Sequence, residues 1–289
     1  MEQSRNQRML ELFTPGRATM MPGAHNALSA RIIEAAGFET MLFTGAGFAN
    51  TYLGVPDMGL TSLKEVVDQV AAMRDAVDIP ILADGDTGFG NALNARRTVR
   101  MMERAGANAL LIEDQVYPKR CGHFENKGVI PKAEMVQKLK AAVDARQSGM
   151  LILARTDSRA VEGIEAALDR VRAYQEAGAD LLFIEAPTSL EELARIPKEV
   201  PGRHLCNMVY GGKTPIPSQK ALGKMGYGAI CYANAALQAS MLAMSKVMKH
   251  LKQTGSLNGV EDAVVSFSER QTFVDYARYV ALEQKYKGA

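Results

Sequence analysis

The chain has 289 residues, close to the roughly 250 typical of one α/β barrel plus an extension. Its hydrophobic fraction of 47% and net charge of +2, without a run of like charges, indicate a globular protein and argue against nucleic acid or an anionic membrane as the main partner. Three widely spaced cysteines, with no signal-peptide core in the first 14 residues and no membrane-length apolar run, predict reduced thiols and a cytoplasmic location.

Short β-type runs alternate with segments of helical periodicity along the chain. We expect strands at 18–21, 40–43, 79–83, 109–112, 151–154, 181–184, 204–208 and 229–232. We expect helices at 26–36, 62–77, 92–105, 132–147, 162–177, 189–198, 217–225 and 234–253. The strands are apolar almost throughout, which is typical of a parallel sheet buried on both faces. The prediction is an α/β protein whose residues 1–255 form a (β/α)8 TIM barrel.

The segment 256–289 follows the eighth strand–helix unit and is expected to add one or two helices. Its apolar residues, among them Val264, Phe267 and Tyr276, need a surface to cover. Because a closed ring of eight units has no place for them, we expect these helices to pack against a partner subunit in a homo-oligomer. A helix folded back on its own barrel is the alternative.

Most of the expected strands end on a polar or ionisable residue that the strand itself does not need. The carboxyl ends of parallel barrel strands meet at one rim, where barrel enzymes have their active sites. These residues are therefore predicted to share one site: Thr44, Asp84 with Asp86, Glu113, Arg155 with Asp157, Glu185 and Asn207.

The run 84–90, Asp-Gly-Asp-Thr-Gly-Phe-Gly, places two carboxylates at the mouth of a strand. Asp84 and Asp86 alternate with Gly85, so both can face one site, and Glu113 at the next strand end adds a third acidic group. Oxygen ligands spaced in this way suit Mg²⁺ or Mn²⁺. An aspartate-rich turn is the structural alternative, because aspartate and glycine dominate turns.

The loop 118–124, Pro-Lys-Arg-Cys-Gly-His-Phe, lies in a long connection of the kind that forms lids and binding loops. Lys119 and His123 close to Cys121 favour its thiolate near neutral pH, which makes Cys121 a candidate acid or base. The alternative is that Cys121 and His123 are incidental loop residues. A zinc site is not indicated, since no second Cys/His cluster is evident.

Arg155 closes the fifth expected strand and is the natural clamp for a substrate carboxylate, which a guanidinium binds through two parallel hydrogen bonds. An ion pair between Arg155 and Glu185 is the competing explanation. The two roles are compatible.

Taken together, these motifs resemble the isocitrate lyase/phosphoenolpyruvate mutase superfamily, in order and over about residues 15–250. The resemblance is carried by 84–90, 113–115, 119–123, 155–157, and residue 207 with 211–215. The Lys-Arg-Cys-Gly-His loop is similar to that of the lyase branch, which includes 2,3-dimethylmalate lyase and 2-methylisocitrate lyase, and to that of carboxyphosphonoenolpyruvate mutase.

The resemblance implies a role for each of three residue sets. A metal set would bind Mg²⁺ directly through its first member and through water with the others: Asp84, Asp57, Asp86 and Glu113. A substrate set would hold the carboxylate of a 2-keto or 2-hydroxy acid and line the pocket: the backbone amides of Thr44, Gly45 and Ala46, then Arg155, Glu185 and Asn207. A catalytic set on a mobile lid would supply the acid/base: Cys121, supported by Lys119 and His123. The resemblance also implies that the C-terminal helices are exchanged between subunits of a homo-oligomer, for which we expect a tetramer.

The implied activity is Mg²⁺-dependent carbon–carbon bond cleavage. The substrate would be a small 2-hydroxydicarboxylate, of the 2,3-dimethylmalate or 2-methylisocitrate type, split by retro-aldol chemistry into pyruvate and a carboxylic acid. Hydrolysis or decarboxylation of oxaloacetate and the mutase reaction share the same metal and enolate chemistry and are the enzymatic alternatives. A metabolite-binding barrel without catalysis is the alternative outside enzymes.

Several residues depart from the pattern of the family. Phe124 stands where methylisocitrate lyases have an arginine, which suggests a substrate with one carboxylate fewer and with alkyl substituents. Leu42 replaces a frequent tyrosine, so the base that takes the hydroxyl proton is unassigned. Tyr210 and the pair Ala233-Asn234 make the pocket wall atypical.

Overall fold

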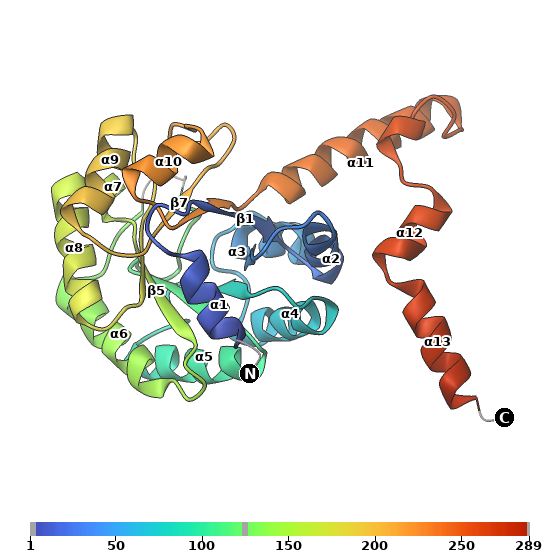
Figure 1. The fold of residues 1–289 in the computed structure, drawn as a ribbon. Helices are drawn as coiled ribbons and strands as arrows, with labels where there is room; N and C mark the ends of the chain where they lie inside the picture. Colours follow the sequence, from blue (N-terminus) through green and yellow to red (C-terminus); the bar gives the residue numbers. More distant parts are fainter. Residues whose placement is uncertain (1–3, 123–126, 288–289) are drawn as a thin grey trace.

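The computed structural model describes residues 4–122 and 127–287. Its centre is a closed barrel of parallel strands in which each strand is hydrogen-bonded to the next and β8 pairs with β1 (Figure 1). The predicted (β/α)8 barrel is confirmed. The strands are β1 (Thr19–Ala24), β2 (Met41–Phe43), β3 (Ile81–Asp84), β4 (Ala109–Glu113), β5 (Leu151–Thr156), β6 (Leu181–Ile184), β7 (His204–Asn207) and β8 (Ala229–Tyr232).

The eight expected helices are present, with ends shifted by a few residues at most. They are α2 (Ala27–Ala35), α4 (Leu63–Ala76), α5 (Ala92–Arg104), α6 (Lys132–Ala145), α8 (Ile164–Glu176), α9 (Leu190–Glu199), α10 (Gln219–Met225) and α11 (Ala235–Thr254). Short helical segments that the periodicity did not reveal are α1 (Arg5–Leu12), α3 (Gly45–Phe48), η1 (Ala49–Leu53) and α7 (Ser158–Val161). Their brevity explains the omission, because a segment of one or two turns gives too few apolar repeats to detect.

Two apolar layers hold the barrel together. One fills its interior with alternate strand side chains such as Leu82, Leu153 and Phe183. Met9 on α1 and Phe13, directly after α1, belong to the same layer. The other lies between the strands and the surrounding helices and contains residues such as Val70, Val99 and Leu168. The strands are thus buried on both faces, as their unbroken apolar character requires.

Local sequence signals set the helix ends. Ser62 caps α4 reciprocally with Glu65, each side chain accepting a hydrogen bond from the other residue's backbone N–H. Gly106 and Gly178, just beyond α5 and α8, have φ of +86° and +100°. Glycine adopts this left-handed conformation at little cost, so the chain can leave the helix and turn into the next strand.

The C-terminal part leaves the barrel. After α11, which leads away from the barrel (Figure 1), the chain forms η2 (Glu261–Ala263), α12 (Phe267–Phe273) and α13 (Tyr276–Tyr286). Of these, α12 contacts α2, and Asp275, just after α12, lies 4.0 Å from Arg31 of α2. The expectation of one or two helices beyond the eighth unit is confirmed, whereas their exchange between subunits stays a prediction. None of the helices in the described ranges combines the length and apolar character needed to cross a bilayer.

Candidate active site

A pocket opens at the carboxyl ends of the barrel strands. Its empty volume is about 550 Å³, including the part open to solvent. Residues from both halves of the sequence line this pocket. This agrees with the expectation that the polar residues at the strand ends share one site. The predicted site residues that line it are Thr44, Ala46, Asp57, Asp84, Lys119, Cys121, Arg155, Glu185 and Asn207.

Asp84 connects two of the remaining predicted residues to the wall of the pocket. Its Oδ2 accepts a hydrogen bond from the backbone N–H of Gly45 at 3.2 Å, and its Oδ1 accepts one from that of Asp86 at 3.1 Å. The intervening Gly85 is required by packing, because a Cβ there would lie 2.6 Å from Leu110 Cδ1 and 2.8 Å from the Leu111 carbonyl oxygen. Asp84 therefore combines a turn-forming role with a position on the pocket wall.

Lys119 is buried among carboxylates. Its side chain is 5% exposed, and its Nζ lies 2.7 Å from Asp57 Oδ1 and 2.7 Å from Asp86 Oδ1. The pKa of Asp86 is raised to about 6, chiefly by burial and also by the nearby charges of Asp84 and Asp57, against the opposing effect of Lys119. Lys119 thus holds acidic groups together and orients them. Its backbone places Cys121 two residues further along the chain.

Glu113 lies at the end of β4 and is 1% exposed. Burial raises its pKa well above the usual value, although Arg155, with its Nε 3.3 Å from Glu113 Oε2, opposes the shift. Its other oxygen, Oε1, has no hydrogen-bond partner within the described ranges. A buried carboxylate oxygen without a partner is costly in a closed interior and marks a place where a ligand or water would be stabilised.

We call Asp57, Asp84, Asp86 and Glu113 the acidic cluster. Its donors are hard oxygens in excess over the neighbouring cations Lys119 and Arg155, which is the chemistry that suits Mg²⁺ with water in the rest of its shell. In the described part of the chain, no three His, Cys, Asp or Glu side chains form a ready-made metal cluster. A site with one direct carboxylate ligand and water-mediated partners does not need one.

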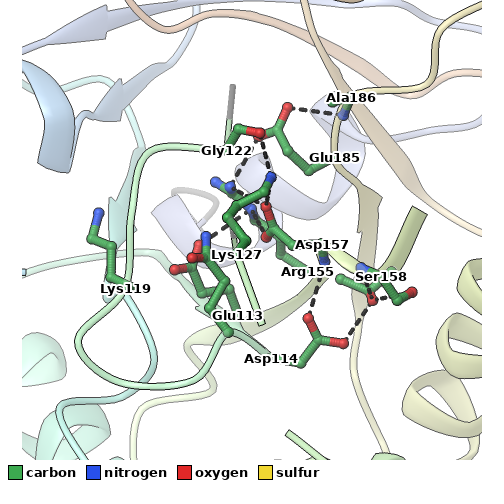
Figure 2. Close-up of polar contacts among 12 residues, drawn as sticks. Glu113, Asp114, Lys119, Gly122, Lys127, Arg155, Asp157, Ser158, Glu185 and Ala186 are labelled. Carbon is green, nitrogen blue, oxygen red and sulfur yellow. Dashed lines mark hydrogen bonds and ion pairs between the residues drawn. The ribbon is translucent and has the colours of Figure 1, made fainter. Parts of the chain in front are cut away.

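Arg155, at the end of β5, is surrounded by carboxylates (Figure 2). It donates to Asp157 Oδ2 from Nε at 2.8 Å and to Asp157 Oδ1 from Nη2 at 3.1 Å, and Nη2 lies 3.2 Å from Glu185 Oε2. The predicted ion pair with Glu185 is therefore present. Arg155 also lines the pocket, and its guanidinium lies 5.4 Å from the ring centre of Phe183. Both roles that the sequence allowed are compatible with this position.

Cys121 lies on the pocket wall with intermediate exposure. Its backbone N–H donates to the carbonyl oxygen of Asp57 at 3.2 Å. The preceding Arg120 is held in both directions by Gln115, whose side-chain amide donates to the Arg120 carbonyl and accepts from the Arg120 N–H. The thiol is therefore placed by backbone contacts on a well-anchored loop. His123, the third member of the predicted catalytic set, lies outside the described residues.

The family comparison agrees with this geometry. The family described as phosphoenolpyruvate phosphomutase matches residues 9–252. The chain belongs to this family, the PEP mutase/isocitrate lyase superfamily. The sequence-based assignment to the superfamily is confirmed.

Named relatives cover nearly the whole chain. The 2,3-dimethylmalate lyase of Eubacterium barkeri is 42% identical over 280 residues, covering 96% of this chain and 97% of that protein. The 2-methylisocitrate lyase of Aeropyrum pernix is 39% identical over 269 residues, covering 93% and 87%. These lyases confirm the prediction of an enzyme of the carbon–carbon lyase type.

Solved structures of the superfamily superpose closely on this chain. A 2,3-dimethylmalate lyase has a TM-score of 0.93 at 32% identity, covering 100% of this chain and 97% of its own. Oxaloacetate acetylhydrolase in complex with 3,3-difluorooxalacetate has a TM-score of 0.93 at 27% identity, with 99% and 98% covered. Phosphonopyruvate hydrolase in complex with oxalate and Mg²⁺ has 0.88 at 29%, with 99% and 100% covered.

Next to the pocket, two residues have contacts for which the sequence predicted no role. Lys127 contacts Asp157 from the far end of the Cys121 loop, and Gln115 clasps Arg120. Lys127 gave little signal, because one lysine in a polar loop has no periodicity or partner that can be read from the chain. Gln115 stands directly after the Glu-Asp pair at the end of β4, and that position was the available clue.

Three of the departures from the superfamily's pattern line the pocket, whereas the expectation that Tyr210 shapes its wall is wrong. Leu42 and Ala233 line the pocket together with Asn234. The Oδ1 atoms of Asn207 and Asn234 are buried and have no hydrogen-bond partner within the described ranges. The pocket therefore has an apolar side and two carboxamides, and Phe124 lies outside the described residues. Tyr210 is 84% exposed and does not line this pocket.

Proposed function

We propose that this protein is a Mg²⁺-dependent lyase that cleaves a small, alkyl-substituted 2-hydroxydicarboxylate of the 2,3-dimethylmalate type, or the related tricarboxylate 2-methylisocitrate, into pyruvate and a carboxylic acid. The observation that carries the proposal is the meeting of Asp84, Arg155 and Cys121 in one pocket. Each supplies a different need of the reaction: a ligand for a cation, a partner for a carboxylate and a proton donor.

Arg155 and the start of α3 would bind the carboxylate of the forming keto acid. Arg155 is oriented by its two hydrogen bonds to Asp157, so its guanidinium need not reorganise when a carboxylate arrives. Thr44 and Ala46 lie across the same pocket. The amide of Gly45 already donates to Asp84, which ties the carboxylate-binding segment to the acidic cluster. The substrate would thus be held between Arg155 and Thr44.

The acidic cluster would hold the cation, with Asp84 as direct ligand and Asp57, Asp86 and Glu113 through water. A divalent cation at this place would act as a Lewis acid on the oxygen that becomes the keto group. Lys119 keeps Asp57 and Asp86 together at its ammonium, so these carboxylates are oriented before any ligand binds.

Cys121 would donate the proton that completes the reaction. The substrate hydroxyl would lose its proton to a base in the pocket, and its oxygen would form the keto group as the bond between the carbinol carbon and its neighbour breaks. The electron pair of that bond is left on the carbon next to the second carboxylate. The thiol would give its proton to that carbon, and positioned proton transfer of this kind is typically worth about 10²–10⁴-fold in rate. Leu42, Phe183 and Leu205 line the same pocket and would exclude water from the carbanion and contact alkyl groups of the substrate.

The proposal is tested by incubating the protein with Mg²⁺ and each acid of a panel that contains 2,3-dimethylmalate, 2-methylisocitrate, isocitrate and malate, and by assaying pyruvate and glyoxylate. We expect pyruvate from at least one alkyl-substituted member and little product from isocitrate. No keto acid from any of them, with metal present, would remove the proposal.

A second candidate is hydrolysis of oxaloacetate, which the close superposition on oxaloacetate acetylhydrolase favours. The two carboxamides of Asn207 and Asn234, which are free of hydrogen bonds at Oδ1 within the described ranges, could orient a water at the same pocket. Oxalate and acetate formed from oxaloacetate would identify this activity, and carboxyphosphonoenolpyruvate turnover would identify the mutase.

We further propose that residues 256–289, together with the exposed side of α11, form the contact between subunits of a homotetramer. The proposal is supported by large apolar side chains that a solitary chain leaves in water: Leu242 and Met244 on α11 are 74% and 58% exposed, and Phe267 on α12 is 73% exposed. The substrate and the subunits would be the only partners, with neither nucleic acid nor membrane involved.

A further inference from the structure

Lys127 is a buried lysine without a part in the chemistry proposed above. Its side chain is 2% exposed, and its ammonium donates to the carbonyl oxygen of Gly122 and to Asp157 Oδ1, the latter at 2.7 Å (Figure 2). Gly122 follows Cys121 directly, and Asp157 orients Arg155. One ammonium therefore joins the loop that carries the thiol to the group that holds the arginine.

The loop end of this connection is packed with little clearance. A Cβ on Gly122 would lie 2.6 Å from Glu185 Cγ and would also collide with Arg155 Nη2, so the backbone rests directly on these side chains. The neighbouring loop residues are fixed elsewhere: Lys119 by Asp57 and Asp86, Arg120 by Gln115, and Cys121 through its N–H by Asp57. Among these contacts, the one between Gly122 and Lys127 connects the loop to Asp157, the counter-ion of Arg155.

The arginine end of the connection concerns charge. Three carboxylates approach Arg155, those of Glu113, Asp157 and Glu185, at 3.3, 2.8 and 3.2 Å. The ammonium of Lys127 partly neutralises the carboxylate of Asp157, whose side chain is 0% exposed. Without this second cation, Asp157 would act on Arg155 alone, and Arg155 would attract an incoming carboxylate less strongly.

We propose that Lys127 is a positioning residue that fixes Cys121 relative to the carboxylate bound by Arg155, by anchoring the loop and the arginine's counter-ion at one ammonium. The inference rests on the proposed function for the roles of Cys121 and Arg155. Proton transfer requires hydrogen-bond reach between donor and carbon, and a displacement of about 1 Å can cost about 10²-fold in rate.

The kinetic test compares Lys127→Met, the double variant Lys127→Met/Asp157→Asn and the control Lys132→Met in 2,3-dimethylmalate cleavage. Lys132 forms an exposed ion pair with Asp169 and should have no effect. For Lys127→Met we expect kcat to fall about 10²-fold and KM to rise about tenfold. The double variant leaves no uncompensated buried aspartate, so KM should return to within about threefold of the wild-type value while kcat stays low.

If Lys127 only stabilised the fold, the double variant would not recover KM while its kcat stays low. A kcat of Lys127→Met within about threefold of wild type would overturn the proposal, and so would a KM that the second substitution leaves unchanged. If Lys127→Met alone does not fold, the double variant keeps the test open, because both buried charges are removed together and its kcat must still be low.

An independent readout is the rate at which iodoacetamide alkylates Cys121 in the folded protein, followed by peptide mass. Cys206 and Cys231 are 2% and 1% exposed, so the label reports Cys121. We expect alkylation to be about tenfold faster in both Lys127 variants than in wild type and the Lys132 control, because the loop is released. An unchanged rate would overturn the proposal. This measurement needs no turnover, so failure of the lyase assay alone would refute only the proposed function.

Discussion

The carboxyl-terminal rim of the barrel and the C-terminal helices α11 to α13 both place side chains in unfavourable surroundings. The rim buries charged groups, and the C-terminal helices expose apolar groups. At the rim, charged groups are buried but face one another: Lys119 lies between Asp57 and Asp86, and Asp157 between Arg155 and Lys127. In α12 and α13 no residue is buried, and the large apolar side chains remain in water. The rim is therefore nearly complete within one chain, apart from a ligand, whereas the C-terminal helices require another surface.

We expect the largest effect at the rim from removal of the proposed metal ligand. Asp84→Ala should abolish turnover and Mg²⁺ dependence together, because the cation loses its direct protein ligand. Asp86→Ala should lower activity by a smaller factor, about 10–100-fold, as expected for a group that acts through water. Turnover measured after chelator treatment and Mg²⁺ titration checks both. Full activity of the Asp84 variant in chelator-treated buffer would rule out this site as the metal centre.

Substitution of the thiol tests the rim's reactive group. Cys121→Ser should lower kcat by about 10²–10⁴-fold with little change in analogue binding, because a hydroxyl is too weak an acid to replace the thiol at pH 7. Steady-state kinetics and calorimetry with oxalate separate the two effects. Cys206→Ser, at a buried position outside the pocket, is the matched control. Near-normal kcat in the Cys121 variant would favour the hydrolase or mutase alternatives.

The C-terminal helices are tested through assembly rather than catalysis. Full-length protein should give a light-scattering mass of about four times 31.3 kDa, and Leu242→Glu should shift it towards the monomer, because a buried charge opposes the interface. Lys252→Glu, a charge change further along the same helix, serves as the control. A monomer at micromolar concentration for the unaltered chain would show that the exposed apolar residues have another purpose.

A smaller effect concerns His204, at the opposite end of the barrel from Asn207 on β7. Burial lowers the pKa of its imidazole to about 4, and its Nε2 is 2.6 Å from the Val200 carbonyl oxygen. Because the folded value lies below the unfolded value of about 6.5, the unfolded state binds the proton first. Stability is thus fully present above pH 6.5 and is lost as the pH falls towards 4.

That loss amounts to about 3 kcal/mol, from about 1.4 kcal/mol for each unit of pKa. Denaturant unfolding of the wild type and His204→Gln between pH 8 and pH 4 measures it. The slope of the free energy of unfolding against pH should be smaller in the variant, whatever its absolute stability. Equal slopes would show that His204 is protonated in the folded protein at little cost.

The sequence by itself determined the barrel and most of the residues of its rim. Eight apolar runs separated by helical periodicity leave few other arrangements, because strands buried on both faces must be parallel and must be joined by helices. Asp84, Arg155 and Asn207 could be placed for the same reason, since each is the residue at which a strand ends or nearly ends. Each of these predictions depends only on residues that are close together in the sequence.

Only the tertiary structure decided which of these groups face one another. Nothing in the order of residues shows that Lys119 lies between Asp57 and Asp86, because the pairing joins residues 62 apart and depends on how the loop crosses the barrel mouth. The same holds for Lys127, which touches Asp157 across 30 residues. These contacts form only when segments that are distant in the sequence pack together. Local sequence patterns therefore cannot predict which charged groups are buried next to one another.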